Sequence, residues 1–132
     1  MNYLDHADLL VVARAALLAE PPVRDHGLIE AASARPRTTV FGQDAYPDIW
    51  QKAAAQLHSL VKGHPLVDGN KRLGWLAARV FLDINGVPGT AVSVDAAETF
   101  VVAVASGSLD DVNDIAEALR RVYETAVSDA GP

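Results

Sequence analysis

The residues from Leu73 to Ile84 show the clearest helical periodicity in this chain, and they constrain its fold more than any other stretch. Gly74 lies inside the stretch, where glycine costs about 1 kcal/mol relative to alanine, so we expect close packing against another backbone there. Asn85-Gly86 then provides a helix stop. A helix with so continuous an apolar face must be buried against other elements. That face consists of Leu73, Leu76, Ala77, Val80, Phe81 and Ile84.

Further segments repeat the same period, and prolines or glycines separate them. Pro21-Pro22 must end the first segment, Pro36 stops the second, and Gly63 breaks the third. Half of the residues are hydrophobic but only 6% are aromatic, which favours helix packing over an aromatic-rich β-sandwich. We therefore predict an all-α protein, a compact bundle of about six helices in a single domain over residues 1–132. The other helical segments cover about residues 9–17, 27–35, 48–62, 94–105 and 112–123.

The pattern changes between Arg37 and Tyr46. Residues 38–41 are β-branched or aromatic, and residues 42–44 favour a turn, so we expect a small β-hairpin. Two strands this short are marginal alone, and they must rest on helices. At the mouth of a cleft, such a hairpin would be a substrate-docking edge.

Charge, cysteine content and hydropathy exclude several classes of protein. A net charge of −6 argues against a general nucleic-acid binder, which needs a basic surface. The chain has no cysteine, so it holds neither a disulfide nor a thiolate metal site. The apolar run over residues 9–19 is interrupted by Arg14 and too short for a bilayer, and the N-terminus lacks the basic region of a signal peptide. We expect a cytoplasmic protein with no membrane partner and no direct nucleic-acid partner.

Nine residues from His64 to Arg72, His-Pro-Leu-Val-Asp-Gly-Asn-Lys-Arg, directly precede the helix described first. The first backbone N–H groups of a helix have no intrahelical partner, so Gly69, Asn70 and Lys71 can donate to an anion. Asn70 would also cap the helix N-terminus. Lys71 and Arg72 would add charge-assisted hydrogen bonds to phosphate oxygens. The segment therefore predicts a phosphate site.

His64 and Asp68 add chemistry to this site. Histidine titrates near neutrality and suits a general base, and the Asp68 carboxylate can hold a divalent cation or orient a substrate. Plainer interpretations stay open, in which His64 is structural and Asp68 forms a turn before glycine. For Lys71 and Arg72 the alternative is chance surface charge. Both oppose the helix dipole at this end, however, and a bound anion would explain them.

The nine residues resemble the core motif of the Fic/Doc family, H-x-F-x-D/E-G/A-N-G/K-R. The resemblance continues upstream through residues 34–36, 41–47 and 52–55, where the family carries a β-hairpin flap. It continues downstream through residues 81–86, where the motif helix ends. Lys71 is typical of the death-on-curing (Doc) branch, whereas Fic adenylyltransferases carry glycine at this position.

Three positions depart from the family pattern. Leu66 replaces the usual phenylalanine and keeps an apolar anchor. Trp75 stands where adenylyltransferases carry a second arginine, which weakens the case for adenylyl transfer. Lys62 stands two residues before His64, where the phage-type Doc has arginine, so a cation is kept without its bidentate fork.

The resemblance implies a Doc-like toxin of a toxin–antitoxin pair that blocks translation. It would be a kinase that moves the γ-phosphoryl group of ATP to a threonine or serine hydroxyl of a protein, with elongation factor Tu as the expected target. His64 would take the hydroxyl proton, and Asp68 would bind Mg²⁺ or orient the nucleophile. The residues that would hold the phosphates or balance charge in the transition state are Lys62, Gly69, Asn70, Lys71 and Arg72.

Two alternatives stay open: protein adenylylation, as in Fic enzymes, and a catalytically silent adaptor that binds a nucleotide or a partner. Fic proteins that restrain themselves carry an inhibitory S/T-x-x-x-E-G/N helix, and no glutamate here is followed by glycine or asparagine. The resemblance therefore implies restraint by a second chain, a Phd-type antitoxin whose disordered C-terminus folds as a helix on the toxin.

Overall fold

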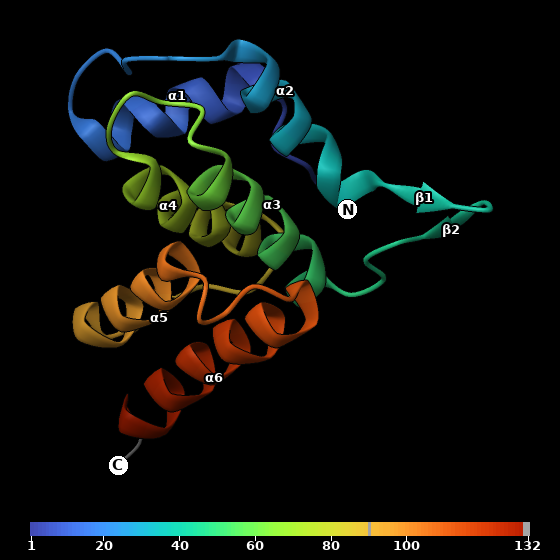
Figure 1. Cartoon of the computed structure of the whole chain (residues 1–132). Helices are drawn as coiled ribbons and strands as arrows, with labels where there is room; N and C mark the ends of the chain where they lie inside the picture. Colours follow the sequence, from blue (N-terminus) through green and yellow to red (C-terminus); the bar gives the residue numbers. More distant parts are fainter. Residues whose placement is uncertain (90, 131–132) are drawn as a thin grey trace.

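The structure is a computed structural model that describes residues 1–89 and 91–130. Two antiparallel helices, α3 and α4, form the centre of the bundle (Figure 1), with α1 and α2 on one side and α5 and α6 on the other. The predicted bundle of about six helices is confirmed within the described residues. The helices are α1 (His6–Leu17), α2 (His26–Ala34), α3 (Ile49–Gly63), α4 (Asn70–Ile84), α5 (Val94–Ser106) and α6 (Val112–Ala130).

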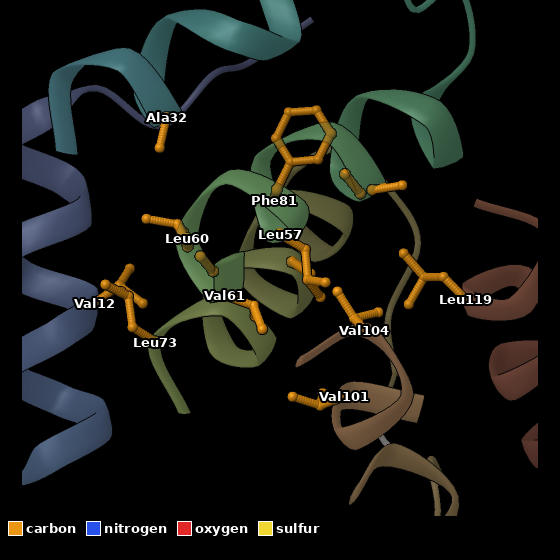
Figure 2. Close-up of a cluster of buried hydrophobic side chains, with 14 of the residues drawn as sticks. Val12, Ala32, Leu57, Leu60, Val61, Leu73, Phe81, Val101, Val104 and Leu119 are labelled. Atoms are coloured by element: carbon orange, nitrogen blue, oxygen red, sulfur yellow. The ribbon is translucent and has the colours of Figure 1, made fainter. Parts of the chain in front are cut away.

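All six helices contribute apolar side chains to one core around α3 (Figure 2). Helix α3 contacts α2, α4, α5 and α6, and its inward residues are almost completely buried. Burial of apolar surface is the main stabilising term in a fold of this size. The labelled core residues are Val12, Ala32, Leu57, Leu60, Val61, Leu73, Phe81, Val101, Val104 and Leu119.

Short polar side chains set where several helices begin. Asp5, Asp25, Asp48 and Ser93 each accept a hydrogen bond from a backbone N–H in the first turn of the helix that follows. Such N-caps satisfy donors that would otherwise lack a partner. The predicted helix starts therefore agree with the observed ones to within a few residues.

Gly74 explains how closely α3 and α4 approach. A Cβ atom placed on Gly74 would lie 2.6 Å from Cγ2 of Val61, nearer than real Cβ atoms come to a neighbour. The predicted close packing at this glycine is confirmed, although its nearest neighbour is a side chain.

A short 3₁₀ turn (Arg35–Arg37) leads from α2 into the predicted hairpin. Strand β1 (Thr39–Val40) pairs antiparallel with β2 (Gln43–Asp44). Phe41 and Gly42 form the turn with positive φ values of 52° and 78°, and the Phe41 side chain is fully exposed.

The position of the hairpin differs from expectation. It joins the N-terminal end of α3, whereas the 64–69 loop leaves the C-terminal end of that 15-residue helix. A helix of this length is about 22 Å long, and Figure 1 shows the hairpin projecting from the opposite end of the bundle. The length of α3 therefore separates the hairpin from the 64–69 loop, and the hairpin does not form the edge of a cleft at that loop.

No helix in the described part of the chain has both the length and the apolar character that a membrane span requires.

Candidate active site

The loop between α3 and α4, residues 64–69, carries most of the predicted motif. Its two ends adopt left-handed backbone conformations. His64 is the C-cap of α3 with φ 53° and ψ 57°, and Gly69 is the N-cap of α4 with φ 91°. A non-glycine residue seldom adopts such angles unless its surroundings hold it there.

Asn70 holds this loop from inside. Its Oδ1 accepts from the Leu66 backbone N–H at 2.9 Å, and its Nδ2 donates to the Leu66 carbonyl at 3.0 Å. These two bonds orient the amide so that Nδ2 faces Nδ1 of His64, at 3.4 Å. An imidazole that accepts a hydrogen bond at Nδ1 carries its proton on Nε2 when it is neutral.

The prediction that Asn70 caps α4 is wrong. Gly69 is the N-cap, and Asn70 is the first helical residue, with its side chain turned back into the loop and 7% of the residue exposed. The Asn70 amide cannot cap the helix because both of its ends are already hydrogen-bonded to the buried Leu66 backbone.

A pocket of about 390 Å³ opens above this loop. The predicted residues of the nine-residue motif converge on it, and Val61 and Ala105 complete its wall from α3 and α5. His64, Asp68, Lys71 and Arg72 are exposed to solvent and reachable by a ligand. The lining residues from the motif are His64, Val67, Asp68, Gly69, Asn70, Lys71 and Arg72.

The start of α4 gives the pocket its anion-binding character. The first bond of the helix runs from Leu73 N to Gly69 O at 3.0 Å, so the N–H groups of residues 70–72 lack an intrahelical acceptor. No described side chain caps this end by a hydrogen bond. The helix dipole and two cationic side chains therefore favour an anion here.

Lys62 is not among the residues that line this pocket. Its Nζ lies near Gly107, in the connection from α5 to α6, 3.5 Å from where a Cβ on that glycine would be. Nearby, His58 donates from Nε2 to Oδ1 of Asp110 at 3.0 Å. This hydrogen bond, helped by the charges of His58 and Lys62, lowers the pKa of the Asp110 carboxyl.

A second cavity of about 460 Å³ adjoins the first between α4 and α5, and the two share Lys71 and Arg72. Trp75 and Arg79 line it on α4, and Glu98 lines it on α5. The Trp75 ring is half-buried and forms a T-shaped pair with Phe100, at 6.1 Å between ring centroids. The two cavities therefore form one extended binding region that meets at the first turn of α4.

Among the described residues no three His, Asp or Glu side chains are grouped to hold a metal ion. Asp68 is a single carboxylate beside an anion site. Mg²⁺ is commonly held by one or two carboxylates together with substrate phosphates. The residues present therefore fit an ion that arrives with a nucleotide, with Asp68 as its protein ligand.

A model described as the Fic/DOC family matches residues 3–82, which span the hairpin, α3, the motif loop and most of α4. The chain belongs to the Fic/DOC family. It is 52% identical over 110 residues to Toxin Doc of Mycolicibacterium smegmatis, covering 83% of this chain and 85% of that protein. It is 32% identical over 106 residues to Protein kinase doc of Escherichia phage P1, covering 80% of this chain and 81% of that protein.

Both relatives carry the Doc name, so the resemblance to the Doc branch of the Fic/DOC family is confirmed. The family match ends within α4, yet Ala105, in α5 and beyond the matched region, lines the motif pocket.

Sequence reasoning missed several residues that contact the motif or line its pocket, among them Arg24 and Ala105. Arg24, in the connection between α1 and α2, donates to the backbone carbonyls of His64 and Gly63. It lies 40 residues before His64, and no local pattern indicates the contact.

Proposed function

We propose that this protein is a Doc-type toxin that transfers the γ-phosphoryl group of ATP to a serine or threonine hydroxyl of a protein. One observation carries the proposal: a histidine, a carboxylate, two cationic side chains and the open N-terminus of α4 converge on one pocket. The names of the two relatives, a toxin and a protein kinase, support it.

The pocket residues have separate roles in this reaction. Lys71, Arg72 and the free N–H groups of α4 hold the phosphates and stabilise charge that develops on them. The substrate hydroxyl oxygen attacks the γ-phosphorus, the bond from that phosphorus to the β–γ bridging oxygen breaks, and ADP leaves. His64 takes up the hydroxyl proton.

Asp68 would hold Mg²⁺ in this scheme, and the ion would neutralise phosphate charge when the nucleotide is bound. Lys62 does not line the pocket, and its Nζ lies near Gly107 in the α5–α6 connection. In this scheme its positive charge would act on the phosphates only at long range. Trp75 lines the adjoining cavity and stands where, by the family resemblance, adenylyltransferases carry a second arginine, so that particular arginine is missing here.

The proposed target is a translation protein, with elongation factor Tu as the first candidate because the Doc resemblance implies it. A target that also reached the hairpin would have to extend along α3, over about 20 Å. Restraint in the cell would come from an antitoxin chain of the Phd type.

Labelled nucleotide tests the reaction directly. We would incubate the protein with Mg²⁺, elongation factor Tu and ATP labelled at either the γ- or the α-phosphate. Transfer of γ-label alone is expected, and it should disappear in His64→Ala but persist in His26→Ala, whose histidine contacts His6 and not the pocket. Transfer of α-label would instead identify an adenylyltransferase.

Expression in cells tests the toxin role separately. The wild-type chain should arrest growth, His64→Ala should not, and coexpression of the neighbouring reading frame should restore growth. Nucleotide binding without transfer of either label and without toxicity would identify a silent adaptor and overturn the proposal.

A further inference from the structure

The connection between α1 and α2 forms backbone hydrogen bonds with the motif loop. Arg24 N and Asp25 N both donate to the Pro65 carbonyl, at 2.8 and 3.0 Å. On the other side, Val67 N donates to the Pro22 carbonyl at 2.8 Å. The loop that carries the catalytic candidates is therefore braced by a segment that lies about 40 residues earlier in the chain.

The Arg24 side chain adds two hydrogen bonds to these backbone contacts. Its Nε donates to the His64 carbonyl at 2.8 Å, and its Nη2 donates to the Gly63 carbonyl at 3.1 Å. These carbonyls belong to the end of α3, where the last C=O groups lack intrahelical donors and the helix dipole is negative. A guanidinium placed there satisfies both acceptors and complements the dipole.

The conformation of His64 makes this contact important. His64 adopts the left-handed region without being glycine, and the direction of its side chain depends on that backbone geometry. Asn70 approaches the ring at Nδ1, whereas Arg24 binds the backbone carbonyl of the same residue. The two residues together determine where the imidazole points.

We propose that Arg24 is a positioning residue for His64. By bridging the Gly63 and His64 carbonyls it holds His64 in its left-handed conformation and keeps the imidazole in the pocket. The proposal rests on the proposed function, since it assumes that the His64 ring takes part in catalysis. It is otherwise independent of which phosphate of ATP is attacked.

The guanidinium suits this role better than an ammonium group. Its planar fork presents two donors in fixed geometry, so one side chain can serve two successive carbonyls. Lysine has three donors on a single flexible nitrogen atom, without the fixed spacing that matches two successive carbonyls. Arg24→Lys keeps the charge but loses the bridge, and it therefore separates the two contributions.

The test compares Arg24→Ala, Arg24→Lys and a matched control, Arg14→Ala, which removes an arginine of α1 that pairs with exposed Glu20. For each folded variant we would measure kcat and KM for ATP and record the imidazole resonances of His64 and His58 by NMR. We expect kcat to fall about tenfold to a hundredfold in Arg24→Ala. KM for ATP should stay close to wild type, because the phosphate-binding residues are untouched.

The NMR arm stands even if the wild-type chain transfers no phosphate. The His64 resonances should shift in Arg24→Ala, by less in Arg24→Lys, and not in Arg14→Ala, while those of His58 stay in place. Unchanged His64 resonances together with wild-type kcat would overturn the proposal, as would equal losses in kcat and in ATP affinity. If Arg24→Ala does not fold, Arg24→Lys decides by the same two criteria.

Discussion

The Nζ atom of Lys52 lies 3.2 Å from Oδ2 of Asp44, so a lysine of α3 binds the second strand of the hairpin. Nζ also donates to the Pro36 carbonyl at 3.3 Å. The Lys52 side chain is only 2% exposed, whereas that of Asp44 is 51% exposed. The pair therefore joins a buried cation to a half-exposed carboxylate. It attaches β2 of the hairpin to α3.

This asymmetry predicts that Asp44→Ala destabilises the protein more than Lys52→Met. Loss of Asp44 leaves a buried ammonium group without its anion, which should cost about 2 kcal/mol. Lys52→Met removes the buried charge and keeps an apolar side chain, while Asp44 can return to water. Urea unfolding of both variants gives the order, and a larger loss in Lys52→Met would contradict this account.

Gly69→Ala should lower the free energy of unfolding by more than the strain of its positive φ angle alone. A Cβ at Gly69 would collide with the Leu17 side chain, and the residue has φ 91°. Gly86 is a matched control, since it has φ 94° and open space at its Cβ position. Gly86→Ala should cost about 1 kcal/mol from backbone strain, and Gly69→Ala about 1–3 kcal/mol more from the collision.

A second substitution separates the collision from the strain at Gly69. The extra cost of Gly69→Ala should shrink in a Leu17→Ala background, measured by urea unfolding as a double-mutant cycle. Equal costs for Gly69→Ala and Gly86→Ala would show that Leu17 does not restrict this end of α4.

Gly74→Ala should destabilise the bundle although alanine is the better helix former. The new methyl group would press on Val61, and overpacking of this kind costs about 1–3 kcal/mol. Because Val61 is almost completely buried and has little room to move aside, we expect a cost near the upper end of that range, which exceeds the helical gain of about 1 kcal/mol. Gly63→Ala in α3 has open space around the added Cβ and should be neutral or stabilising. Thermal unfolding of the two variants should shift the midpoint in opposite directions, or leave it unchanged for Gly63→Ala.

The bond from His58 to Asp110 predicts a pH-dependent contribution to stability. It lowers the pKa of Asp110 below 3.8 in the folded state, so the contribution is complete above pH 3.8 and is lost as the pH falls through the folded value. Asp110→Asn should therefore be less stable than wild type at neutral pH, with a gap that closes in acid. Unfolding in urea at a series of pH values measures the gap.

The partner of Asp110 provides the control. In a His58→Ala background, Asp110→Asn should have little further effect at any pH, because the hydrogen bond is already lost. A gap of constant size from neutral to acid pH would show that the bond does not stabilise the folded state.

Local chemistry explains why much of the fold could be predicted. The segment predicted over about residues 48–62 is α3, and Asp48 caps its start by accepting from the Gln51 N–H at 2.8 Å. Gly74 was informative because a helix seldom keeps a costly residue without a packing reason. The motif residues from His64 to Arg72 are adjacent in sequence, so their convergence on one pocket follows from a single loop and helix start.

Tertiary geometry explains what could not be predicted. Asn70 obeys no capping rule here because it bonds to the Leu66 backbone, a partner that only the folded loop provides. Arg24 reaches His64 across 40 residues, and nothing in its own surroundings in the sequence indicates this. The hairpin was expected by type and position in the chain, but its direction relative to the motif depends on how α3 lies in the bundle.

Ala105 of α5 closes a pocket whose other walls come from residues 61–72. A chain that leaves the ribosome N-terminus first exposes its nine-residue motif well before this wall exists. A nascent chain that stops short of α5 would therefore carry every motif residue and still lack a complete pocket. The pocket is therefore completed only when α5 has been made and packed against α3 and α4, and not when the motif itself has been translated.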